Sequence, residues 1–63
     1  MMKSYSIHKG RDGQHETMII SRRETGAEIA EYRTDDYDAE ARRMRRVIDA
    51  HLAAGRGLGN YQW

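Results

Sequence analysis

The sequence predicts an α+β fold in which a three-stranded antiparallel meander (βββ) is followed by one amphipathic helix packed on one sheet face. Two patterns support this prediction. Residues 3–33 alternate apolar and polar side chains and contain glycine-rich turns, as consecutive hairpins do. Residues 35–54 repeat apolar side chains every three or four positions, as one face of a helix does. The glycine-rich, aromatic C-terminal tail, 55–63, is expected to be flexible.

The length and composition predict a small soluble protein. A chain of 63 residues forms a single domain, 1–63, and buries only about 60% of the surface that its unfolded form exposes. It contains no Cys, so neither a disulfide nor a thiolate metal site can stabilise it. No apolar run reaches the roughly 18 residues needed to span a bilayer, and no secretory signal is evident. We therefore expect a cytoplasmic protein that does not contact a membrane.

The first two strands are expected over about 3–9 and 15–23. In "SYSIHK", Tyr5 and Ile7 lie on one side of the strand and polar residues lie on the other. The stretch "GRDG" follows, and its Asp-Gly pair is typical of a chain reversal. The next segment, "HETMIISRR", is rich in residues that favour strands.

The third strand is expected over 27–33, after a three-residue hairpin loop, "ETG", in which Gly26 adopts the left-handed conformation. This loop sets the register: Arg23 opposite Ala27, Arg22 opposite Glu28, Ile20 opposite Ala30, and Met18 opposite Tyr32. An Arg22–Glu28 ion pair is then expected at the rim of the sheet. One sheet face collects the apolar residues and is expected to be the core face: Tyr5, Ile7, Met18, Ile20, Ala30 and Tyr32.

The opposite sheet face has no second helix to cover it, so it is expected to contact solvent or a partner. Its residues are Ser4, Ser6, His8, Thr17, Ile19, Ser21, Arg23, Ile29, Glu31 and Arg33. Ile19 and Ile29 are expected to lie near each other beside cations, and such apolar area on a small domain favours partner binding. The alternative is that β-branched residues simply favour strands wherever they point. The predicted partner-binding residues are Ile19, Ile29, Arg23, Arg33, His8, Tyr61 and Trp63.

The helix is expected over about 35–54, with Thr34, Asp35 or Asp36 as its cap and Gly55 at its end. Its apolar stripe comprises Tyr37, Ala41, Met44, Ile48 and Leu52, flanked by Val47 and His51. Four arginines occupy positions 42, 43, 45 and 46, with Arg42 and Arg46 opposite the stripe. Three helix ion pairs are expected: Asp38–Arg42, Glu40–Arg43 and Arg45–Asp49. We favour a solvated face over a contact with phosphates or an acidic partner.

No catalytic, cofactor or metal site is expected. His8 and His15 lie near the first turn and face each other in one register, but no third ligand converges on them. A flat strand surface offers Ser4, Ser6 and Ser21 neither a pocket nor an oxyanion hole. The "GRGLG" run follows a helix, whereas phosphate-binding loops precede one. For Leu58, Tyr61 and Trp63, packing on the open sheet face, disorder and a role as an anchor all remain open.

The stretch "AEIAEYRTDDYDAEARRM" resembles the third strand, turn and helix start of the plant AP2 DNA-binding domain and the arm-type DNA-binding domain of tyrosine integrases. The resemblance implies DNA contacts from the open sheet face, by Arg23 and Arg33 with Lys9 and Arg11, although this face has no Trp and carries Glu31. The spacing of "YSIHKGRDG" and "RRETGAEIAEY" is similar to that of the small YegP-like domains.

Two functional hypotheses follow, and neither is an enzyme. The first is a protein-binding module of the kind that phages and mobile elements encode as an inhibitor of a host complex, similar to an anti-CRISPR. The second is a small DNA-binding accessory protein, for which a net charge of only +1 gives little bulk attraction. Its nucleic-acid residues would be Lys9, Arg11, Arg23, Arg33, Arg42 and Arg46. A homodimer formed through the open face or an edge strand is a third possibility.

Overall fold

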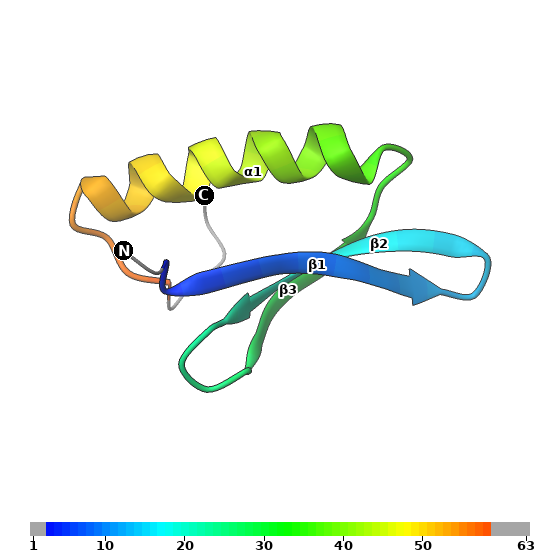
Figure 1. Ribbon diagram of the computed structural model, residues 1–63, viewed down its shortest axis with the longest axis horizontal. Helices are drawn as coiled ribbons and strands as arrows, with labels where there is room; N and C mark the ends of the chain where they lie inside the picture. Colours follow the sequence, from blue (N-terminus) through cyan, green and yellow to red (C-terminus); the bar gives the residue numbers. More distant parts are fainter. Residues whose placement is uncertain (1–2, 59–63) are drawn as a thin grey trace.

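The computed structural model describes residues 3–58 and confirms the predicted α+β fold. Its elements are the strands β1 (Tyr5–Asp12), β2 (His15–Arg22) and β3 (Glu28–Arg33), and the helix α1 (Tyr37–Ala53). The strands form one antiparallel sheet in the order β1-β2-β3. The helix lies along one face of this sheet (Figure 1). In the part of the chain that is described, no helix has the length and apolar character needed to cross a membrane.

The first hairpin is longer than predicted, because Gly10 lies inside β1 and not in the turn. Gly10 pairs with Thr17, and the chain reverses at Gly13, whose φ is 65°. A Cβ added to Gly10 would lie 2.4 Å from Cδ1 of Ile19 and 2.6 Å from Oγ1 of Thr17. The glycine therefore makes room for two side chains of β2, and a glycine within a strand often marks such a close approach.

The second hairpin confirms the left-handed Gly26 and part of the predicted register, but its loop is one residue longer than predicted, because Arg22 and not Arg23 bonds to Ala27. Gly26 has a φ of 76° and donates a 2.8 Å hydrogen bond to the carbonyl of Arg22. The predicted pairs Ile20–Ala30 and Met18–Tyr32 are present. A bulge then shifts the register, so that Ser21 and not Arg22 lies opposite Glu28. The predicted Arg22–Glu28 pair is therefore wrong, because β3 carries one extra residue, Ile29, between Glu28 and Ala30.

The core lies between α1 and the sheet, as the alternation and the helical stripe predict. Its buried residues are Tyr5, Met18, Ile20, Ala41, Met44, Ile48 and Leu58. Half-buried residues pack around them: Ile7, Ile29, Ala30, Tyr32, Tyr37 and Leu52. Two of these placements differ from expectation. Leu58, in the tail expected to be flexible, joins the core, and Ile29 packs against the core because the bulge breaks the alternation of β3.

The ends of α1 are fixed by local hydrogen bonds. Asp36 is the N-cap, and its carboxylate accepts a 3.2 Å bond from the backbone N–H of Ala39. After the helix, Gly55 has a φ of 83°, and the N–H of Arg56 donates to the carbonyl of His51 at 3.2 Å.

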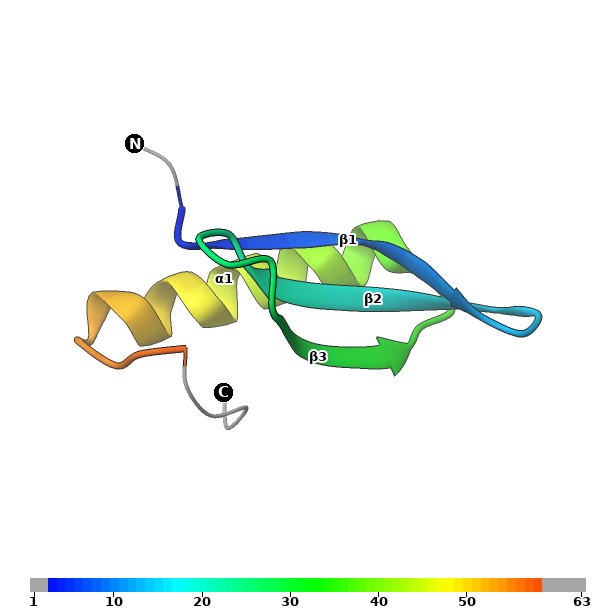
Figure 2. The ribbon, with the colours of Figure 1, turned by 90° about the horizontal axis from the view of Figure 1, so that it is seen from below.

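Seen from the side of the sheet away from α1, the three strands lie in front of the helix (Figure 2).

Candidate binding surfaces

The open face, meaning the side of the sheet turned away from α1, is more closed by its own side chains than predicted. Thr17 is only 2% exposed, and its hydroxyl donates a 2.7 Å hydrogen bond to Oε2 of Glu31. Ile19 is half-buried and lies over the space that Gly10 leaves. Since Ile29 packs against the core, the predicted pair of neighbouring isoleucines does not form on this face.

Arg33, predicted to contact a partner, is paired within the chain. Its Nε and Nη2 atoms donate to Oδ2 of Asp12 at 3.2 and 3.0 Å, so that the side chain reaches from β3 to β1. Both side chains are exposed, so the pair adds little stability. It does, however, neutralise the guanidinium. A shallow hollow of about 340 Å³ lies here, lined by Arg11, Asp12, Thr17, Glu31, Tyr32 and Arg33.

The other cations predicted for the open face do not gather there. The Nζ of Lys9 lies 5.3 Å from the centroid of the Tyr37 ring and 4.0 Å from Oε2 of Glu16. The ring of Tyr37 belongs to α1, so Lys9 lies on the helix side of the sheet. Arg23 is exposed and donates a 3.4 Å bond to the carbonyl of Tyr5. The predicted set of DNA-contacting residues is thus divided among separate surfaces.

The predicted histidine pair is also absent. His8 lies opposite Ile19 and His15 lies opposite Asp12, and both histidines are exposed. Within residues 3–58, no group of three or more His, Cys, Asp or Glu side chains could hold a metal ion. Tyr61 and Trp63, the aromatic residues predicted to bind a partner, lie outside the described residues.

One of the three predicted helix ion pairs, Glu40–Arg43, is confirmed. Nε and Nη2 of Arg43 donate to the two carboxylate oxygens of Glu40 at 2.8 and 2.7 Å. The hydroxyl of Tyr32 donates to the same carboxylate at 2.9 Å. The Arg43 bonds, helped by the Tyr32 bond, lower the pKa of Glu40 from about 4.5 to about 2, although burial acts in the opposite direction.

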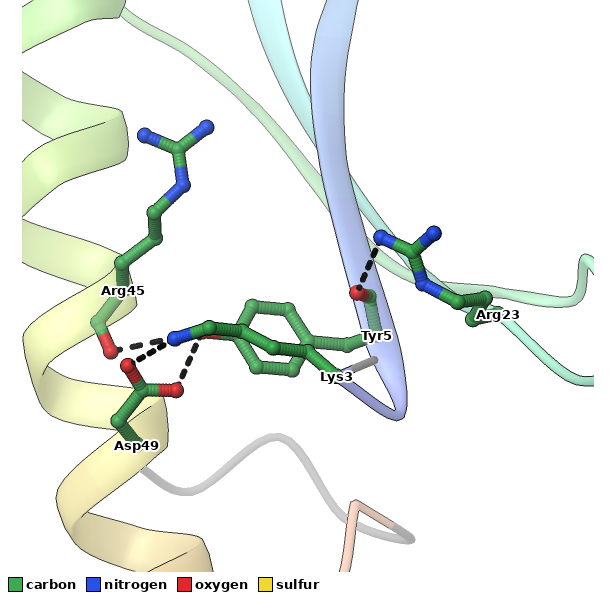
Figure 3. A network of polar contacts seen from close by, with 5 residues as sticks. All are labelled: Lys3, Tyr5, Arg23, Arg45 and Asp49. Atoms are coloured by element: carbon green, nitrogen blue, oxygen red, sulfur yellow. Dashed lines mark hydrogen bonds and ion pairs between the residues drawn. The ribbon is translucent and has the colours of Figure 1, made fainter. Parts of the chain in front are cut away.

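Asp49 does not pair with Arg45 as predicted, because residues at the start of the chain occupy it. It forms an ion pair with Lys3 and accepts a 2.7 Å hydrogen bond from the hydroxyl of Tyr5 (Figure 3). The bonds from Lys3 and then Tyr5 lower the pKa of Asp49. Burial, followed by the Asp49 contact, raises the pKa of Tyr5. Spacing along the helix could not predict this arrangement, since it depends on where β1 begins relative to α1.

These pairings leave Arg42, Arg45 and Arg46 exposed. Within residues 3–58, no ion pair or hydrogen bond involves the guanidinium of any of the three, and Asp38 does not pair with Arg42. Residues spaced three and four apart are neighbours on a helix surface, so the three side chains share one side of α1 over about 6 Å of its axis. We call this surface the arginine face. The arginine face was not predicted from the sequence, because the expected pairs Asp38–Arg42 and Arg45–Asp49 would neutralise two of its three residues.

Comparison with known proteins identifies no relative. The chain matches no protein family, no curated protein and no solved structure. The resemblance to the AP2, integrase and YegP-like domains therefore stays a prediction.

Proposed function

We propose that this protein is a non-enzymatic protein-binding module that docks on an acidic patch of a partner protein through the arginine face of α1. The supporting observation is the set of three neighbouring, exposed arginines whose guanidinium groups form no ion pair or hydrogen bond within residues 3–58. The chain has ten acidic residues, and several of them neutralise other cations. A guanidinium binds carboxylates through two parallel hydrogen bonds, which suits it to an acidic protein surface.

The charges around the arginine face favour a protein over a nucleic acid. The face is compact, and a carboxylate stands beside it on the helix, at Asp38, four residues before Arg42. A duplex presents a negative charge about every 1.7 Å along its axis, so DNA lying along α1 would also meet this carboxylate. A local acidic patch on a protein would meet only the arginines.

A module that occupies an acidic patch excludes whatever else binds there. The role that we propose is therefore inhibition of a complex by surface occupation, which is consistent with a phage or mobile-element inhibitor of the anti-CRISPR kind. The DNA-binding alternative shares Arg42 and Arg46 with this proposal. An experiment must therefore separate the two classes of partner.

The test compares two triple variants that remove the same charge. One replaces the arginine face (Arg42→Gln, Arg45→Gln and Arg46→Gln), and the control replaces three exposed or half-exposed arginines elsewhere (Arg11→Gln, Arg22→Gln and Arg23→Gln). Fluorescence anisotropy measures binding of a labelled peptide of alternating Asp and Glu at about 50 mM salt. Each exposed pair contributes about 0.5 kcal/mol, so loss of three should weaken binding about tenfold. The control should weaken it much less.

Two results would overturn the proposal. Equal weakening by both triple variants would mean that only net charge attracts the peptide. Absence of peptide binding, with binding of a labelled duplex that weakens steeply between about 50 and about 200 mM salt, would support the DNA-binding alternative instead.

A further inference from the structure

The outer edge of β3 offers unpaired backbone groups at two charged residues. In the described part of the chain, β3 has a neighbouring strand only on its β2 side. Just after β3 ends, the N–H of Thr34 donates a 3.2 Å hydrogen bond to the backbone carbonyl of Glu16 on β2. Backbone groups alternate along an antiparallel strand, so those of Tyr32 also turn toward β2 and those of Glu31 and Arg33 turn outward. Such an edge is a template for another strand.

We propose that a second copy of this chain pairs with this edge, β3 against β3, about a twofold axis at Tyr32. In this register Glu31 of each copy lies opposite Arg33 of the other copy. Both residues have outward backbone groups, so each Glu31–Arg33 pair exchanges two backbone hydrogen bonds and four bonds join the two copies. A single strand thus supplies a complete, self-complementary interface.

The charges of the edge fit this register. Glu31 and Arg33 are exposed and lie two positions apart, so their side chains are on the same face of the sheet. Oε2 of Glu31 accepts a hydrogen bond from the Thr17 hydroxyl, which leaves Oε1 for the second copy. Arg33 uses Nε and Nη2 for Asp12, which leaves Nη1. Charged residues usually protect an edge from pairing, but here opposite charges fall directly across from each other, which favours pairing.

Tyr32 adds an aromatic contact at the axis. It would lie opposite its own copy at a position without backbone hydrogen bonds between the copies, where side chains approach most closely. Its ring is half-buried on the helix side, and its hydroxyl is held by Glu40 at 2.9 Å. A twofold axis perpendicular to the sheet keeps both helices on one face. The dimer would therefore present two arginine faces on the same side of a continuous sheet.

Sedimentation equilibrium over a concentration series tests the pairing. The wild-type chain should show a monomer–dimer equilibrium. Glu31→Arg and Arg33→Glu each place like charges opposite each other, and each should raise the dimer Kd at least about tenfold. The double variant Glu31→Arg/Arg33→Glu restores opposite charges and should restore the wild-type Kd to within about threefold, although it has lost the Asp12 and Thr17 contacts.

Glu28→Arg is the matched control, because it makes the same charge change on β3 outside the Glu31–Arg33 pairs, and it should leave the Kd unchanged. Circular dichroism of every variant shows whether it is folded. A wild-type chain that stays monomeric to about 1 mM would overturn the proposal. So would a dimer that the single variants do not weaken, or a folded double variant that does not recover the dimer.

Discussion

The hydroxyl of Tyr5, the first residue of β1, donates a 2.7 Å hydrogen bond to Oδ1 of Asp49 in α1. Lys3 forms an ion pair with the same carboxylate, and the Tyr5 ring is buried in the core (Figure 3). This cluster joins two segments that are far apart in the sequence. Asp49 forms no ion pair with Arg45, although the charge of Arg45 still contributes to the lowered pKa of Asp49.

Replacing Tyr5 by Phe should therefore lower the free energy of unfolding by about 1.5–3 kcal/mol, because the ring stays in place and one hydrogen bond to a charged group is lost. Urea denaturation measures the change. In an Asp49→Ala background the same replacement should cost much less, because the acceptor is already absent. Equal costs in the two backgrounds would contradict the importance of this bond.

Gly10→Ala should destabilise the protein by about 1–3 kcal/mol, because the new methyl group would overlap Ile19 and Thr17. Thermal and urea denaturation measure the loss. In an Ile19→Ala background the cost should be smaller, since the nearest atom is gone. His8→Ala, at an exposed position on the same strand, is the control and should change stability by less than about 0.5 kcal/mol.

Ile29→Glu should destabilise the fold by about 1–2 kcal/mol, because the bulge turns Ile29 against the core and a carboxylate there would lose hydration. Ala27→Glu introduces the same group at a nearby exposed position and should be close to neutral. If Ile29→Glu is as neutral as this control in urea denaturation, Ile29 belongs to the open face as the sequence pattern suggested.

The order of elements and most of the core could be predicted from sequence, because alternation in strands and the three-to-four spacing in helices are local consequences of backbone geometry. The left-handed Gly26 and the pairs at Ile20 and Met18 could be predicted in the same way. The position of Gly10 within β1 could not be predicted from sequence, because "GRDG" is compatible both with a turn and with a strand that has a close side-chain contact. The bulge that turns Ile29 toward the core could not be predicted either, because no residue type near it in the sequence indicates a bulge.

The candidate surface was harder to predict than the fold. Arg42 and Arg46 were placed correctly on the outside of the helix, and Glu40–Arg43 paired as expected. Whether an exposed arginine is neutralised, however, depends on contacts between distant segments. Asp49 is held by Lys3 and Tyr5, and Arg33 is held by Asp12 on a strand that is not its neighbour. Spacing along one helix or strand does not contain that information.

The Glu40 carboxylate predicts an acid dependence of stability. Because its pKa is near 2 in the folded protein and near 4.5 when unperturbed, the contribution of its ionised form is complete above about pH 4.5. It is lost as the pH falls from there to about 2. Glu40→Gln should therefore be less stable than wild type at neutral pH, and the difference should shrink toward pH 2 in chemical denaturation. A difference that is independent of pH would contradict the lowered pKa.

The most direct test of the binding surface is a nuclear magnetic resonance titration of ¹⁵N-labelled protein with the peptide of alternating Asp and Glu. The backbone and arginine side-chain signals of Arg42, Arg45 and Arg46 should shift in a saturable, salt-sensitive manner. Signals of His8, Ile19 and Glu31 should stay in place. Shifts confined to those three open-face residues, with the arginine signals unchanged, would contradict the claim that the protein binds through α1.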